Sequence, residues 1–150
     1  MNTKKAGVTL IELIIVLSVI GICLSAAALT LSGGGNTGIV NALKTLQSDM
    51  RGARHLSINE SVYTRISFDN INHGYFIQKR VGTQYELVES VKLKGVKVEV
   101  VSSPNKMISF TERGTPSSAC TITLSSKSHI GKITVNVGSG RVKITEISKK

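Results

Sequence analysis

The sequence predicts an α+β protein in which an N-terminal apolar helix, extended by a second helix, precedes antiparallel β-sheets. Three observations predict this fold class. An apolar run fills residues 8–31, apolar residues recur at helical spacing over residues 39–59, and short alternating segments occupy the rest of the chain. Because no helical pattern separates these segments, they are expected to pair as antiparallel strands on which the second helix packs.

The apolar run from Val8 to Leu31 is long enough to cross a membrane. As a helix, its 24 residues would extend about 36 Å, against about 30 Å for a hydrocarbon core. Lys4 and Lys5 precede the run, which predicts a single-pass anchor in the cytoplasmic (inner) membrane, with the N-terminus in the cytoplasm and the C-terminal domain outside. A secretory signal is one alternative, although the run is too long for it, and residues 26–28 supply small residues for cleavage. A generic anchor is the other.

Glu12 is the one ionisable residue of this run, and neither alternative explains it. A carboxylate costs about 2.5–3.5 kcal/mol at the centre of a membrane helix and usually has a partner. Cleavage after Gly7 would create such a partner, the α-amino group of Val8. The amine of a neighbouring helix, shifted along the axis, could come closer to Glu12 than the amine of the same helix. Glu12 would then set the stagger between packed helices.

The sequence Lys-x-Gly-x-Thr-Leu-Ile-Glu at residues 5–12, followed by the apolar run, resembles the leader of type IV pilins and pseudopilins. The resemblance implies a leader peptide of residues 1–7, removed after Gly7 by a prepilin peptidase. It also implies N-methylation of Val8, where the family usually has Phe, and Glu12 as the assembly residue. The implied partners are other pilin or pseudopilin subunits, the peptidase and the membrane.

Residues 32–38 contain four glycines and predict a hinge, since glycine is unfavourable in a helix. A soluble domain is expected over residues 39–150. It starts with a helix over residues 39–59, for which Thr37 is the expected N-cap. The predicted buried stripe of this helix consists of Ile39, Leu43, Leu46, Met50 and Ala53.

Eight alternating segments follow this helix. They lie at residues 62–68, 75–80, 85–91, 96–101, 106–110, 119–125, 130–137 and 141–147. The glycines at 138 and 140 favour a hairpin between the last two. Trp is absent and aromatic residues make up 4% of the chain, so the core is expected to consist mostly of Ile, Val and Leu. Cys120 is expected to be a small buried apolar residue.

The predicted soluble domain is strongly basic. From Ile39 onward, 17 Lys and Arg stand against 8 Asp and Glu, a net charge of +9. Such an excess favours acidic partners such as nucleic acid, anionic lipid headgroups or acidic cell-wall polymers, although a basic surface also serves solubility. The best local candidate is residues 140–143, where Arg141 and Lys143 are expected to point outward, with Lys132 nearby.

Residues 108–114, 121–124 and 133–142 carry short motifs of alternating apolar residues and glycines. Through them the tail of the chain resembles a subgroup of the family, the minor pseudopilins of the type II secretion H type and the fimbrial T type. A fimbrial T-type relative is implicated in DNA uptake through a Gly-Arg-x-Arg stretch at this place, where this chain has Lys143 as the second cation. The resemblance implies DNA contact by Arg141 and Lys143, and Lys132 is a further candidate because of its charge and position. Such contact would be directed at the phosphate backbone. The alternative is a hairpin with a solvated outer face.

The expected function is that of a minor pilin or pseudopilin, a membrane-anchored subunit that assembles into or initiates a type IV pilus or a type II secretion pseudopilus. A cell-surface pilus is one expected location. The alternative is a DNA-binding minor pilin in natural transformation. No enzyme, cofactor or metal site is expected, because His55, His73 and His129 lack neighbours at ligand spacing.

Overall fold

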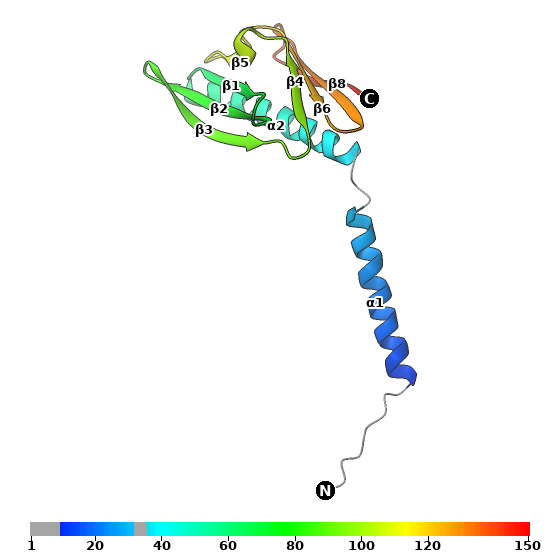
Figure 1. The fold of residues 1–150 in the computed structure, drawn as a ribbon. Helices are drawn as coiled ribbons and strands as arrows, with labels where there is room; N and C mark the ends of the chain where they lie inside the picture. The colour runs from blue at the N-terminus through cyan, green and yellow to red at the C-terminus, as the bar shows by residue number, and fades with distance from the viewer. Residues whose placement is uncertain (1–9, 32–35) are drawn as a thin grey trace. The chain divides into compact units, whose positions relative to one another are not determined.

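The structure, a computed structural model, describes residues 10–31 and 36–150 of the chain (Figure 1). The chain divides into two units, with the boundary after Gly34. The first contains helix α1 (Leu10–Leu31), and the second contains every other element. The predicted leader, residues 1–7, and residues 32–35 of the predicted hinge lie outside the described residues.

Helix α2 (Asn36–Glu60) opens the second unit and provides one wall of its core. Leu43, Leu46 and Met50 of the predicted stripe are completely buried. The helix begins earlier than predicted, so residues 36–38 of the predicted hinge are helical, and Thr37 lies inside the first turn instead of capping it. A glycine is tolerated in that turn because its amides have no intrahelical partners and the packed stripe downstream stabilises the helix.

The strands form two antiparallel sheets that lie side by side along α2 (Figure 1). Sheet A has the order β3-β2-β1-β5, and sheet B has the order β4-β6-β7-β8. The strands of sheet A are β1 (Thr64–Asp69), β2 (Gly74–Val81), β3 (Gln84–Lys92) and β5 (Met107–Phe110). Those of sheet B are β4 (Lys97–Val101), β6 (Cys120–Ser125), β7 (His129–Val135) and β8 (Val142–Lys149), and a 3₁₀ turn, η1 (Pro104–Lys106), precedes β5.

Rows of isoleucine fix the register of both sheets. In sheet A, Ile66 lies opposite Ile77 on one side and Ile108 on the other. In sheet B, Ile133 lies between Ile122 and Ile144. A slip of one residue would turn each row from the core to solvent, so burial specifies the pairing. The prediction of a core built mostly from Ile, Val and Leu is confirmed, and Cys120 is buried as expected. Burial raises the pKa of the Cys120 thiol.

Polar side chains attach α2 to both sheets. The Gln47 amide donates to the carbonyl of Val142 in β8 at 2.9 Å. The Tyr75 hydroxyl of β2 donates to an Asp49 carboxylate oxygen at 2.5 Å, and burial raises the pKa of Tyr75, which keeps that hydroxyl protonated. The Thr64 hydroxyl of β1 donates to the carbonyl of Ala53 at 3.0 Å. These contacts hold α2 in register with both sheets as well as against them.

Candidate functional site

Helix α1 presents apolar side chains in every direction over residues 10–22, the part of the helix whose side chains the structure describes. Leu10, Ile11 and Ile22 are the most exposed of them. A helix that is apolar all round has to be covered by lipid or by other apolar helices. Among the residues that the structure describes, no helix combines the length and the hydropathy needed to cross a membrane.

Glu12 lies in the first turn of α1. A carboxylate is favoured there because the unpaired amides at a helix N-terminus carry partial positive charge. Ser18, the next polar residue along the helix, donates its hydroxyl to the carbonyl of Ile14 at 2.8 Å and so satisfies itself within the helix. Gly7 and Val8, the residues expected at the cleavage site, lie outside the described residues.

The three basic residues predicted for DNA contact do not form one site. Lys132 lies in β7 and pairs with Glu146 at 2.6 Å, and this contact lowers the pKa of the Glu146 carboxyl. Lys143 lies in β8 opposite Thr134 and is exposed on the outer face of sheet B. Arg141 is exposed too, but it lies in the turn before β8 and faces a different set of neighbours.

Arg141 lines a cavity of about 350 Å³ between α2 and the β7–β8 turn. The cavity is lined by Arg51, Arg54, His55, Ser139, Gly140, Arg141 and Val142. Arg51, Arg54 and His55 have helical spacings of three and four residues, which places them on one face of α2. Three guanidinium groups and an imidazole therefore converge here from two distant parts of the sequence.

Arg54 stabilises the loops that form the wall of this basic cavity. Its Nε donates to the carbonyl of Gly114 at 3.0 Å, and one Nη donates to the carbonyl of Gly140 at 3.5 Å. Gly140 has a φ of +60°, and a Cβ at that position would come within 3.0 Å of the Arg54 guanidinium. Glycine at 140 thus permits both the turn and the approach of the arginine.

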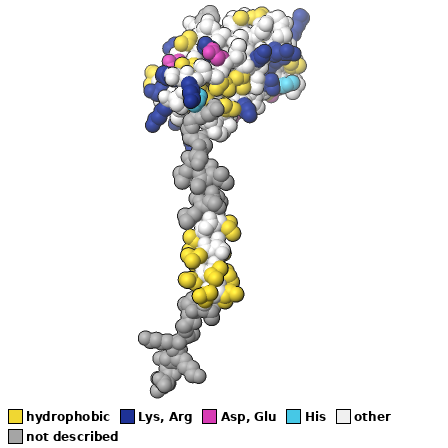
Figure 2. Space-filling model, turned by 90° about the vertical axis from the view of Figure 1, so that its right-hand side faces the viewer, with side chains coloured by type: hydrophobic (Ala, Val, Ile, Leu, Met, Phe, Trp, Pro, Cys, Tyr) yellow, Lys and Arg dark blue, Asp and Glu magenta, His cyan; other side chains and the backbone are white. Residues whose placement is uncertain are grey.

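The basic cavity has no acidic residue in its lining. The ion pairs among the described residues are Lys79–Glu60, Lys132–Glu146 and Lys150–Glu99, and none includes a cavity residue. Arginine presents a planar fork of donors that matches phosphate oxygens. The arrangement is therefore suited to phosphate groups. Figure 2 shows far more Lys and Arg than Asp and Glu on the face that it presents.

Sequence reasoning found Arg141 but missed Arg51, Arg54 and His55. Their spacing is visible in the sequence, yet it is also typical of a solvated helix face. What makes them a site is the β7–β8 turn, more than 80 residues later, and its position follows from the sheet pairing rather than from any local pattern.

The chain matches a family model and a curated protein. Residues 2–28 match the model described as the prokaryotic N-terminal methylation motif. The chain is 30% identical over 146 residues to the competence protein ComGD of Bacillus subtilis, an alignment that covers 96% of this chain and 95% of that protein.

Two solved structures share the fold. The minor pseudopilin EpsH from the type II secretion system of Vibrio cholerae matches with a TM-score of 0.59 and 8% identity, over 69% of this chain and 93% of EpsH. The type IV minor pilin FimU of Pseudomonas aeruginosa matches with a TM-score of 0.59 and 14% identity, over 71% of this chain and 87% of FimU. The predicted α+β architecture of a helix packed on antiparallel sheets is confirmed.

Proposed function

The chain belongs to the type IV pilin and pseudopilin family, and we propose that it serves within that family as a subunit of a competence filament that takes part in natural transformation. It is a membrane-anchored minor pilin or pseudopilin, and proteins of this family are structural subunits rather than enzymes. The observation that carries the proposal is the alignment, along nearly the whole of both chains, with a protein named for competence.

The proposed assembly route starts at the N-terminus. The prepilin peptidase removes residues 1–7, Val8 becomes the methylated first residue, and Glu12 docks on the amine of a neighbouring subunit. The N-terminus faces the cytoplasm and the second unit lies outside the membrane. The matched methylation motif, the all-round apolar surface of α1 and the position of Glu12 in its first turn support this route.

Deletion of the gene is expected to abolish transformation by added DNA and to leave protein secretion and twitching unchanged. The physical reason is that a filament lacking one of its subunits does not assemble, so that only the process served by that filament stops. Transformation frequency, the secreted protein profile and surface motility are measured in the deletion strain, with the wild-type gene restored as the control. Normal transformation together with defective protein secretion would assign the subunit to a type II secretion pseudopilus instead.

A second candidate function is direct contact with DNA, and the basic cavity is the observation that favours it. Arg51, His55 and Arg141 are exposed around it, while Arg54 holds the turn that carries Arg141. Phosphates bound there would be recognised through their charge and oxygen geometry, so binding is expected to be independent of sequence and sensitive to salt.

The double substitution Arg51→Gln and Arg141→Gln is expected to weaken DNA binding by the full chain in detergent and to reduce the slope of log K against log salt by about 2, one for each lost phosphate contact. Lys132→Gln is expected to have little effect, because Glu146 already compensates that charge. Binding is measured by gel shift across a salt series with a duplex oligonucleotide.

The matched control is the pair Lys92→Gln and Lys94→Gln, which removes the same charge from exposed residues beside the N-terminal part of α2. The control is expected to keep the wild-type slope. An equal loss in both double variants would mean that net charge alone attracts DNA, and the cavity would then have no specific role.

A further inference from the structure

Several loops lie at one end of the second unit, beside the start of α2. The β3–β4 connection lies there, because Lys92 and Lys94 line a small pocket together with Gly38 and Asn41. Since neighbouring strands are antiparallel, the β1–β2 turn, the β6–β7 turn and the end of β8 reach the same end of the two sheets. We call this surface the end face.

The end face carries a cluster of exposed lysines. They are Lys92, Lys94, Lys97, Lys127, Lys149 and Lys150. Two carboxylates lie among these segments, and both are engaged. Asp69 accepts hydrogen bonds from Asn72 and from the amide of Ile71, which lower its pKa. Glu99 accepts a hydrogen bond from Ser125 at 2.5 Å and lies 3.7 Å from the Lys150 ammonium.

An isoleucine projects from the same end. Ile71, in the β1–β2 turn, is 89% exposed, whereas the next most exposed large apolar side chain of the second unit, Leu87, is 59% exposed. The turn is held by Asp69, whose carboxylate accepts from the amides of Ile71 and Asn72 at 2.8 and 3.1 Å. An exposed isoleucine side chain surrounded by lysines is suited to a surface whose outer layer is charged and whose interior is apolar.

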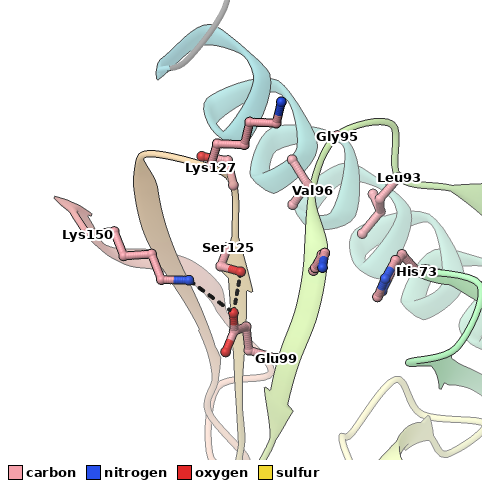
Figure 3. A pocket seen from close by; sticks show the side chains of 10 residues that line it. His73, Leu93, Gly95, Val96, Glu99, Ser125, Lys127 and Lys150 are labelled. Carbon is pink, nitrogen blue, oxygen red and sulfur yellow. Dashed lines mark hydrogen bonds and ion pairs between the residues drawn. The ribbon is translucent and has the colours of Figure 1, made fainter.

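The end face also contains a cavity of about 370 Å³ with an apolar floor and a basic rim. Leu93 and Val96 form part of the floor, and Lys97, Lys127 and Lys150 line it from three segments. Glu99 lines the cavity as well, where its carboxylate accepts from Ser125 and lies beside the Lys150 ammonium. His73 and Leu93 lie on one side of the start of β4, and Ser125, Lys127 and Lys150 lie on the other (Figure 3). The Nδ1 atom of His73 is buried, and no described residue offers it a hydrogen-bond partner.

The segment that connects α1 to α2 is short. Leu31 ends α1 and Asn36 begins α2, so five residue steps separate them, and their Cα atoms can be at most about 18 Å apart. The start of α2 therefore stays near the membrane surface if α1 ends there.

We propose that the end face binds the anionic phospholipid surface from which the chain emerges, with Ile71 entering between the headgroups and a headgroup phosphate bound in the cavity. The proposal rests on the orientation given under the proposed function. Lysine is a point charge suited to a fluid layer of headgroups, and an aliphatic tip gains free energy by leaving water. Nucleic acid would gain nothing from Ile71 or from the apolar floor, and its recognition favours arginine and aromatic stacking.

The absence of Trp from the sequence permits a direct test. The full chain carrying Ile71→Trp is reconstituted in nanodiscs of phosphatidylcholine alone or mixed with phosphatidylglycerol. The Trp emission is expected to shift to shorter wavelength in the anionic discs and to be quenched there by brominated lipid. In phosphatidylcholine discs, and at high salt, it is expected to resemble Trp in water.

Charge reversal at Lys92, Lys94 and Lys127 to Glu is expected to abolish the shift, since each lysine at an anionic surface strengthens association about fivefold. Two matched controls are included. Val81→Trp, in β2 at the other end of sheet A, is expected to stay solvent-like in all discs, and Arg51→Gln with Arg141→Gln is expected to leave the Ile71→Trp signal unchanged.

Two results would overturn the proposal. One is a solvent-like emission from Ile71→Trp in anionic discs. The other is a blue shift produced by a duplex oligonucleotide added to the detergent-solubilised chain, which would identify the end face as a nucleic-acid surface. Neither result depends on transformation or filament assembly, so the lipid contact and the competence function fail or succeed separately.

Discussion

Replacement of Gly7 by valine is expected to leave the full-length precursor as the only form of the protein in the cell. The residue before the cleaved bond has no side chain in the wild type, and a β-branched residue adds bulk beside the scissile peptide and restricts its backbone. Because the α-amino group then stays at Met1, Glu12 also loses its proposed partner, and filament assembly is expected to stop.

The measurement is an immunoblot of membranes together with mass spectrometry of the N-terminal peptide. Ala6→Val serves as the matched control, because it adds the same side chain one residue earlier in the leader. That variant is expected to be processed. A mature chain beginning at Val8 in the Gly7→Val variant, or a wild-type chain still beginning at Met1 beside an active peptidase, would contradict the assignment.

Glu12→Gln is expected to separate processing from assembly. The amide keeps the size of the side chain and removes its charge, so the leader is still removed but the subunit no longer docks on a neighbouring amine. Loss of one member of a poorly solvated ion pair costs about 3–5 kcal/mol. Each contact is therefore expected to weaken on the order of a hundredfold or more. The amount of subunit in sheared filaments is compared with that in membranes.

Ser18→Ala is the matched control for the Glu12 variant. Ser18 is polar and lies in the same helix, but its hydroxyl is satisfied by the carbonyl of Ile14, so its loss is expected to leave docking between subunits intact. This variant is expected to enter filaments at the wild-type level. Wild-type recovery of Glu12→Gln in filaments would refute the docking role, whatever the state of the leader.

The strands and the second helix were predictable because their signals are local. All eight alternating segments are strands, with bounds that differ by at most two residues at either end. The predicted final pair shows why small errors remain. β7 ends at Val135 rather than at Val137, because Asn136 uses its side-chain oxygen to accept from the Gly138 amide and so starts the turn early.

The assignment of each strand to one of the two sheets and the basic cavity were not predictable in the same way. β5 pairs with β1, more than 40 residues earlier, and leaves β4 to pair with β6. Nothing in the pattern of β4 or β5 specifies that choice, since both alternate alike. Arg51 and Arg141 line one cavity because α2 packs against β7 and β8, and no local pattern specifies that packing. The salt bridge from Lys132 to Glu146 was not predictable for a related reason, because it follows from the register of β7 with β8.

The polar contacts that join α2 to both sheets have a mechanical consequence. Three hydrogen bonds join successive turns of α2 to strands, and they are made by Gln47, Asp49 and Ala53. A tensile force applied along α2 would therefore load these bonds in shear and share the load among them, whereas a force that peeled the helix off would break them one at a time. A subunit of this construction resists stretching along its spine more strongly than lateral separation.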